Sequence, residues 1–302
     1  MFPTMTKLLP AALILTAALT VPAAQAKPAP GKYAEVNGLK MYYEVHGRKA
    51  GDTPPLVMIH GAFGTIDNCF GKLIPLLAKK RQVIAVELQG HGRTADIDRP
   101  LRYEQMADDV AALLKAIKVN SADVYGYSMG GATALQVAIR HPDVVRKLVV
   151  ASATFDNTGW QPGLLDMIKS LKPEQLAGSP WAKDYARVAP QPANWNKLVD
   201  KVKELDSRPQ QWPSKDIQGI KAPTLMIAGD SDAVTPEHAV QIYRLRGGGA
   251  MGDLVGLPDS QLAILPGTHH VGVLERVEMQ AAIVPAFLDA PLKKNVAAKA
   301  PR

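Results

Sequence analysis

The chain alternates short apolar runs with longer segments in which apolar residues recur at helical spacing. The apolar runs lie at 56–59, 82–88, 122–125, 147–152, 224–228 and 262–265. Runs of this kind are typical of parallel strands that are buried on both faces. Between them, the segment 103–117 places Met106, Val110 and Leu113 on one helical face. The alternation predicts an α/β protein with a mostly parallel, twisted sheet and helices on both faces.

Other segments extend this prediction. Helical patterns also occupy 69–80, 132–140 and 237–246. The residues from Tyr33 to His46 alternate between apolar and polar, and Asn37-Gly38 between them is a hairpin turn signal. We therefore expect an antiparallel hairpin at one edge of the sheet.

The alternation is interrupted between Phe155 and Ile220, a segment rich in proline and tryptophan with helical pieces such as 196–205. Open α/β sheets keep their sites at the carboxyl ends of the strands, and an insertion here lies over those ends. We therefore predict a small helical lid at about 155–220. Its tryptophans either pack the lid or line an apolar pocket; they are Trp160, Trp181, Trp195 and Trp212.

The first residues have the features of an export signal. Lys7 precedes an uncharged apolar run from Leu8 to Val21, and the small residues Ala24-Gln25-Ala26 follow. This pattern predicts a secretory signal peptide at residues 1–26 that is removed after Ala26. The run is shorter than the roughly 20 apolar residues of a membrane-spanning helix. We expect a periplasmic or secreted protein with no membrane span after cleavage, in which 27–302 form one domain.

Charge and cysteine content narrow the function classes. The formal net charge is +7, but lysine and arginine are scattered rather than gathered into the basic stripe that nucleic-acid binding needs. The single cysteine, Cys69, allows no internal disulfide and is expected to be a small buried residue. No spacing indicates a metal site, and no cofactor is expected. Nothing in the sequence sets the oligomeric state.

The sequence Gly-Tyr-Ser-Met-Gly-Gly at 126–131 is the strongest chemical signal. It follows a predicted strand and precedes a predicted helix, with glycines two residues before and after Ser128. A sharp strand-to-helix turn needs residues without Cβ, and it raises the serine hydroxyl above the end of the sheet. The free amides at the start of the helix then face that hydroxyl. The motif predicts a nucleophilic serine.

A serine nucleophile needs a base and a group that orients the base. Two later strands end in suitable residues. Asp230 and Asp232 follow the strand at 224–228, and His269 and His270 follow the strand at 262–265. The order serine, aspartate, histidine is the order expected for this kind of turn.

With these motifs the chain resembles the α/β-hydrolase superfamily, and within it the single-domain bacterial hydrolases: esterases, carbon–carbon bond hydrolases and haloperoxidase-like enzymes without a cofactor. The resemblance covers most of the chain after residue 26. Its motifs are HGAFG at His60, QGHGRT at Gln89, GYSMGG at Gly126, GDSDAVTP at Gly229 and PGTHH at Pro266.

The resemblance implies roles for individual residues. Ser128 is the nucleophile, Asp232 the orienting acid and His270 the general base, with Asp230 and His269 as the alternatives for the acid and the base. Asp230 is then a turn residue that binds nearby backbone amides, and His269 a flanking residue. The oxyanion hole takes the backbone N–H groups of Ala62 and Met129.

These assignments predict a serine hydrolase that forms an acyl-enzyme, with a small molecule carrying an ester or carbonyl group as substrate. A carboxylic ester is the first expectation. Carbon–carbon bond hydrolysis and perhydrolysis use the same triad and stay open, as does a relative that binds a ligand without turning it over. The glycine-rich run at 247–252 matches a dinucleotide-binding spacing, but it follows a helical pattern instead of a strand, which argues against a nucleotide site.

Overall fold

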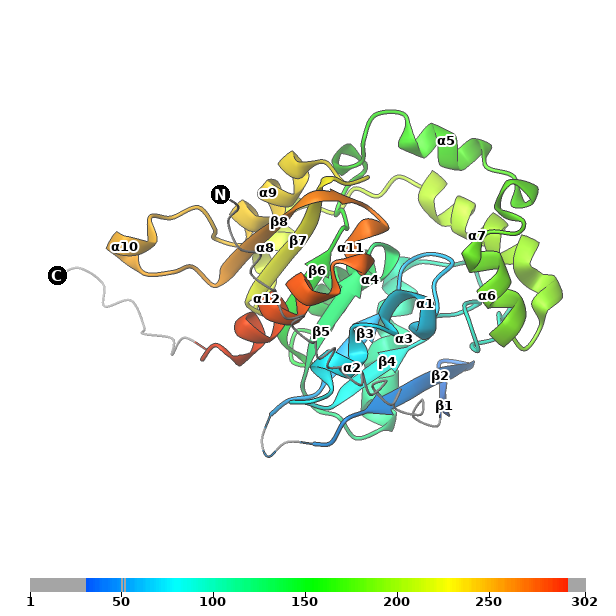
Figure 1. Cartoon of the computed structure of the whole chain (residues 1–302), viewed down its shortest axis with the longest axis horizontal. Helices are drawn as coiled ribbons and strands as arrows, with labels where there is room; N and C mark the ends of the chain where they lie inside the picture. Colours follow the sequence, from blue (N-terminus) through cyan, green and yellow to red (C-terminus); the bar gives the residue numbers. More distant parts are fainter. Residues whose placement is uncertain (1–30, 50, 52, 293–302) are drawn as a thin grey trace, which may run out of the picture.

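The computed structural model describes residues 31–49, 51 and 53–292 of the chain (Figure 1). The predicted signal peptide at 1–26 lies outside these residues. None of the helices within the described ranges combines the length and the apolarity that a bilayer-spanning helix requires.

The centre of the structure is one sheet of eight strands in the order β1-β2-β4-β3-β5-β6-β7-β8. The first two strands join the rest through antiparallel pairs, β1 with β2 and β2 with β4, and all other pairs are parallel. The strands are β1 (Lys32–Val36), β2 (Leu39–His46), β3 (Leu56–Ile59), β4 (Val83–Val86), β5 (Ala122–Tyr127), β6 (Val145–Ala151), β7 (Thr224–Ser231) and β8 (Ser260–His269). The predicted fold class is confirmed.

Helices cover both faces of the sheet (Figure 1). The longer ones are α3 (Tyr103–Ala116), α4 (Met129–Arg140), α6 (Pro180–Val188), α7 (Trp195–Ser207), α9 (Pro236–Leu245) and α12 (Val277–Asp289). The shorter ones are α1 (Ile66–Phe70), α2 (Ile74–Leu77), α5 (Leu164–Ser170), α8 (Ser214–Gly219), α10 (Gly252–Val255) and α11 (Gly272–Glu275). Three single turns of 3₁₀ helix complete the set: η1 (Asn157–Gly159), η2 (Pro173–Leu176) and η3 (Pro192–Asn194).

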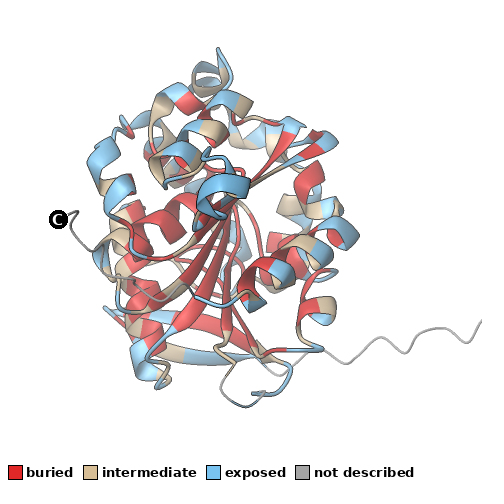
Figure 2. Cartoon of the chain, turned by 90° about the vertical axis from the view of Figure 1, so that its left-hand side faces the viewer, coloured by how far each residue is buried: buried red, intermediate tan, exposed pale blue. Residues whose placement is uncertain are grey.

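Alternate residues of the buried strands point to two separate cores. In β3, Val57 and Ile59 pack toward α3 and α4, whereas Leu56 and Met58 pack toward α1, α2 and α12. Figure 2 shows the buried residues gathered on the strands and on the helix faces that meet them. All residues of β3, β4 and β5 are buried, which explains the continuous apolar sequences of β3 and β4. The one charged residue of β5, Asp123, is paired with Arg81 and Arg146.

The predicted hairpin is confirmed as β1 and β2, with Val36 paired to Leu39. Asn37 and Gly38 both have positive φ, at 50° and 79°, as a two-residue hairpin turn requires. One predicted helix is wrong: 69–80 contains the end of α1 and all of α2 instead of one continuous helix. Gly71 ends α1, and Pro75 lies in the first turn of α2, so the pattern is broken between them.

The segment predicted as a lid, 155–220, contains η1, α5, η2, α6, η3, α7 and α8. Its last helix, α8, packs Ile217 into the core beside the sheet. Ion pairs join the middle of the segment to the loops at the strand ends: Arg187 on α6 contacts Asp67 at 2.7 Å, and Lys201 on α7 contacts Asp96 at 2.6 Å. In Figure 1, α5, α6 and α7 form the upper right of the molecule, beyond the sheet.

Candidate active site

Ser128 lies in a sharp turn between β5 and α4. Its φ of 53° and ψ of −120° are unusual for a residue with a side chain. The turn depends on the glycines around it: a Cβ on Gly126 would overlap the carbonyl oxygen of Gly130, and one on Gly130 would overlap that of Ile59. The two glycines therefore allow the helix to begin directly against the strands.

His270 is the residue directly after β8, and its ring is within hydrogen-bonding distance of both Ser128 and Asp232. Its Nε2 lies 2.9 Å from Ser128 Oγ, and its Nδ1 lies 2.6 Å from Asp232 Oδ1. The Tyr127 hydroxyl donates a hydrogen bond to the backbone oxygen of His270 at 3.0 Å. Residues more than 100 positions apart are thus joined in one chain of hydrogen bonds.

The carboxylate of Asp232 is fully buried and well supplied with donors. Besides His270 it accepts hydrogen bonds from the Ser152 hydroxyl at 2.6 Å and from the amides of Gly229 and Val234 at 3.0 and 3.1 Å. Burial alone would raise its pKa, but His270, Ser152 and the Gly229 amide outweigh burial, and the pKa is lowered. Asp232 is therefore ionised beside the histidine.

Ser152 is a residue of this site that the sequence did not single out. It follows β6 directly, has a positive φ of 52° and is buried. The sequence signal that could have identified Ser152 is its position as a polar residue at the carboxyl end of a central strand. Its partner, however, is 80 residues away in the sequence, so the contact with Asp232 could not be read locally.

The alternative acid and base are placed elsewhere. Asp230 is exposed and accepts hydrogen bonds from the amides of Gly267 and Thr268 at 2.7 and 2.9 Å; these bonds lower its pKa. His269 is exposed, and its Nδ1 accepts from the Gly272 amide at 3.0 Å. The structure brings Asp232 and His270 to Ser128. Asp230 instead joins the end of β7 to the backbone at the end of β8, and His269 makes a local contact in the chain.

The predicted oxyanion donors face the same space as the serine. Ala62 and Met129 line the cavity that contains Ser128. Within the described residues, neither backbone amide donates a hydrogen bond to another group. Gly61 passes so close to Ser128 that an added Cβ would lie 3.2 Å from the serine Cβ. Both residues thus border the cavity beside Ser128 with backbone N–H groups that have no acceptor among the described residues.

Three other residues with reactive side chains, His60, His91 and Cys69, have buried surroundings and structural contacts. His60 Nε2 accepts from the Leu88 amide at 3.0 Å, and burial lowers its pKa to about 3. His91 contacts the carbonyl of Gln89 at 2.9 Å, and burial lowers its pKa to about 4. Burial raises the pKa of Cys69 to about 12, so its thiol keeps its proton. None of the three competes with Ser128 and His270.

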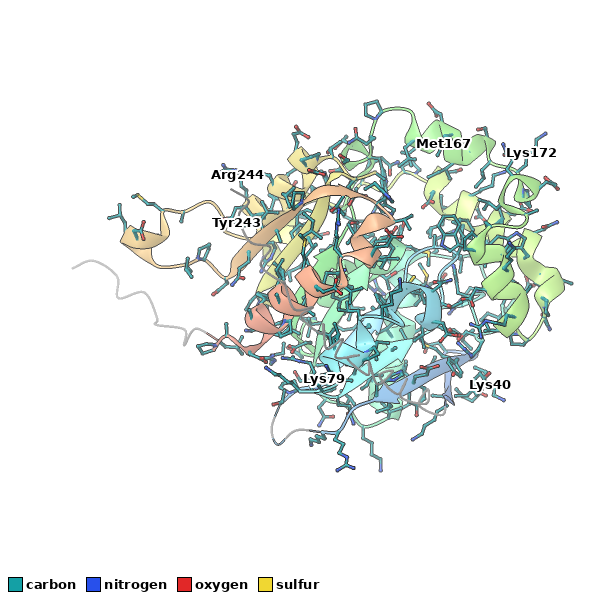
Figure 3. All side chains as sticks on the ribbon, in the orientation of Figure 1. Lys40, Lys79, Met167, Lys172, Tyr243 and Arg244 are labelled. Atoms are coloured by element: carbon teal, nitrogen blue, oxygen red, sulfur yellow. The ribbon has the colours of Figure 1, made fainter. Side chains whose placement is uncertain are left out.

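A cavity of about 250 Å³ opens from Ser128 beneath the lid segment. Its lining is mainly apolar, and much of it comes from α5 and its neighbours: Trp160, Leu164, Met167, Ile168, Leu171, Leu176 and Trp181. Met167, labelled in Figure 3, is on α5 and is 58% exposed, so this helix also meets solvent. Trp195 and Trp212 pack against the core instead. The two interpretations of the lid tryptophans thus each apply to one pair.

One wall of this cavity is polar, and the sequence did not indicate it. We name it the α3–α7 wall: Tyr103 from α3, and Val202, Lys203 and Asp206 from α7. The Tyr103 hydroxyl lies 3.4 Å from Asp206 Oδ1, a long distance for a hydrogen bond between oxygens. Burial raises the pKa of Asp206 to about 7.

A larger open groove, of about 810 Å³, lies away from the serine. Among its lining residues, Arg99 pairs with Asp109 and His141 with Asp108. Across the described part of the chain, no group of three or more His, Cys, Asp or Glu side chains is arranged to hold a metal ion.

Comparison with known proteins agrees with this geometry. Residues 54–187 match the family model for the alpha/beta hydrolase fold. The chain is similar to a pimeloyl-acyl-carrier-protein methyl ester esterase of Neisseria meningitidis, 28% identical over 78% of this chain and 93% of the relative. It is also similar to a dihydrolipoyllysine-residue acetyltransferase component of an acetoin cleaving system of Pseudomonas putida, 31% identical over 86% of this chain and 70% of the relative.

Solved structures share the architecture. An enol-lactonase from Burkholderia xenovorans superposes with a TM-score of 0.66 at 22% identity, covering 86% of this chain and 100% of that one. The sharp turn at Ser128, the strand order and these similarities lead to one assignment. The chain belongs to the α/β-hydrolase superfamily and is a hydrolase.

Proposed function

We propose that this protein hydrolyses carboxylic esters through an acyl-enzyme on Ser128, with His270 as general base and Asp232 as the orienting acid. The observation that carries the proposal is the continuous hydrogen-bonded chain from Ser128 Oγ through both nitrogens of His270 to Asp232. A protein that only binds its ligand has no need of a base aligned on its serine.

The geometry supports a two-step reaction. With its proton on Nδ1 held by Asp232, the His270 ring accepts the Ser128 proton at Nε2 as Oγ attacks the ester carbonyl carbon. The amides of Ala62 and Met129 stabilise the negative oxygen. The protonated ring then gives its proton to the leaving alkoxide, which departs as the alcohol. Water repeats the sequence on the acyl-enzyme and releases the acid.

Two features favour an ester with a short or medium apolar chain. The cavity is lined mostly by Trp, Leu, Ile and Met side chains, which bury hydrocarbon well. Its volume of about 250 Å³ lies below the roughly 300–1,000 Å³ of pockets for drug-sized ligands. The relative from Neisseria meningitidis is named as a methyl ester esterase, which favours the same bond type.

The test is covalent labelling with a fluorophosphonate, followed by location of the adduct by mass spectrometry. We expect the adduct on Ser128 and no labelling of Ser128→Ala or His270→Ala. Hydrolysis of butyrate, hexanoate, octanoate and palmitate methyl esters, followed in a pH-stat, then defines the chain length. Labelling without turnover of any ester would overturn the ester assignment. In that case carbon–carbon bond cleavage, tested with a vinylogous diketone, would take its place.

The proposal extends to location and access. We propose that residues 1–26 direct export and that the lid segment controls entry to Ser128. Mass spectrometry of the intact protein from a periplasmic extract should give a chain beginning at Lys27. A full-length chain recovered from the cytoplasm alone would contradict export without affecting the chemistry at Ser128.

A further inference from the structure

The α3–α7 wall presents a carboxyl group that the protein itself scarcely uses. Asp206 accepts one hydrogen bond, at 3.4 Å from the Tyr103 hydroxyl, and among the described residues it has no ion-pair partner. Its neighbour Glu204, by contrast, is paired with Arg102 and Arg208. Asp206 is half-buried, and a partly desolvated carboxylate with so few donors carries a desolvation cost that the protein does not offset.

The desolvation cost of Asp206 bears on function because Asp206 lines the proposed substrate cavity. Asp206 lines the same cavity as Ser128 and His270, among mainly apolar side chains. A leucine at this position would contact the same lining without the cost, since buried charges contribute little to stability unless well paired. A destabilising polar group directed into a binding cavity is typical of a residue that serves the ligand.

The neighbouring groups narrow the chemistry of that ligand. Lys203 lies on the same helix and also lines the cavity, so one cation and one carboxyl group face the same space. A cationic substrate would be repelled by Lys203, and a substrate carboxylate would be repelled by Asp206. An uncharged hydroxyl group avoids both conflicts, because it can donate to Asp206 and accept from Lys203 or from the Tyr103 hydroxyl.

Packing fixes the position of the Tyr103 ring. It is 8% exposed, and the Trp212 ring meets it edge-on with centroids 5.6 Å apart. The ring therefore cannot turn away freely, and its hydroxyl stays at the cavity wall. A substrate hydroxyl bound between Tyr103 and Asp206 would give the Asp206 carboxyl group the close hydrogen bond that it lacks within the protein.

We propose that Tyr103, Lys203 and Asp206 form a polar subsite that binds a hydroxyl group on the substrate chain, so that the preferred esters are hydroxylated. This inference rests on the proposed esterase function for the identity of the reaction. It concerns binding, however, and can be measured without turnover.

The test compares methyl octanoate with methyl 8-hydroxyoctanoate, and methyl hexanoate with methyl 6-hydroxyhexanoate. Binding is measured on Ser128→Ala protein by the fluorescence of Trp160 and Trp181, which line the cavity. We expect the hydroxylated ester of at least one pair to bind about tenfold more tightly, as for a hydrogen bond to a charged group. The kcat/KM values of the wild type should show the same preference.

Two further variants identify the residues. Adding Asp206→Leu should reduce the binding ratio to one or below, and adding Tyr103→Phe should reduce it by a smaller factor. The control is Asp200→Leu, an exposed aspartate on the same helix, which should leave the ratio unchanged. If Asp206→Leu does not fold, Tyr103→Phe alone decides.

The outcomes separate the two proposals. A ratio near one in both pairs, or a ratio that neither variant alters, overturns the subsite even if both esters are hydrolysed. A tenfold ratio in binding, with no hydrolysis of any ester by the wild type, supports the subsite and overturns the esterase function.

Discussion

Ser128 and His270 form one wall of the cavity, which we name the catalytic wall after the role proposed for it. Behind this wall Asp232 accepts four hydrogen bonds, whereas at the α3–α7 wall Asp206 accepts a single long one. The pKa of Asp232 is lowered, and burial raises that of Asp206 to about 7. The carboxyl group of Asp232 is thus ionised and fixed by its donors, whereas the carboxyl group of Asp206 is only partly ionised near pH 7. The difference shows that donors, rather than burial, decide how an aspartate serves a cavity.

The two walls also differ in what holds them. The catalytic wall is built from strand ends, where Gly126 and Gly130 allow backbone to contact backbone directly. The lid segment is held by side chains of α7 that enter the core, such as Leu198 and Val202, and by ion pairs on its surface, such as Arg187 with Asp67. Close packing fixes geometry tightly, and exposed ion pairs contribute little. We expect substitutions at the first wall to have much larger effects.

The largest effect is expected at the orienting acid. Asp232→Asn should lower kcat by about 10⁴-fold, because the amide favours the wrong tautomer of His270. The matched control is Asp230→Asn, two residues away, whose carboxylate accepts hydrogen bonds from Ser231 and from the amides of Gly267 and Thr268, and does not contact the His270 ring. It should lower kcat by less than about tenfold. Equal losses in the two variants, measured on one methyl ester, would contradict the assignment of the acid.

Next in size is the packing around Ser128. Gly126→Ala forces a Cβ against the backbone oxygen of Gly130 and should lower the free energy of unfolding by about 3 kcal/mol. Gly163→Ala, at the start of α5, meets no atom within 4 Å, but its φ is 82°. It should cost about 1 kcal/mol through backbone strain alone. Urea denaturation of both variants measures the difference, and a greater loss at Gly163 would reverse the comparison.

A smaller, pH-dependent effect is expected at Asp206. Below about pH 4 its carboxyl group is protonated in the folded and the unfolded protein alike. Between about pH 4 and its folded pKa of about 7, the folded protein retains a proton that the unfolded chain releases. Rising pH therefore favours unfolding over this interval.

Asp206→Asn removes that term while keeping the size of the side chain. The variant should gain stability relative to the wild type as pH rises from 4 to 7, and the gain should level off above 7. Thermal unfolding at pH 5, 6, 7 and 8 gives the comparison. Tyr103 and Lys203 line the same wall. Burial raises the pKa of Tyr103, so its hydroxyl keeps its proton over this range. A gain that shrinks with rising pH would show that Asp206 is well paired.

The smallest effect is expected at the surface of the lid segment. Arg187 is more than half exposed and pairs with Asp67 and Asp184. Arg187→Ala should lower the free energy of unfolding by no more than about 1 kcal/mol, as for other exposed ion pairs. A loss that persists in 1 M salt would indicate packing rather than charge as its cause, since salt of that strength screens exposed pairs.

Much of the catalytic wall could be predicted from sequence because its signals are local. Gly126 and Gly130 flank Ser128 within one turn, and the aspartates and histidines directly follow strands whose apolar sequences are plain. Ser152 and Asp206 escaped prediction because each acts through a distant partner. Tyr103 and Asp206 are 103 residues apart and meet only because α7 lies across α3 at the cavity.

The sequence by itself determined the order of strands and helices, the hairpin at Asn37-Gly38 and the turn at Ser128, because these follow from side-chain periodicity and from the steric needs of glycine positions. The tertiary structure alone decided that Ser152 donates to Asp232 and which polar side chains line the cavity. Those outcomes depend on the groups that packing brings together from distant parts of the chain, and no local pattern records them.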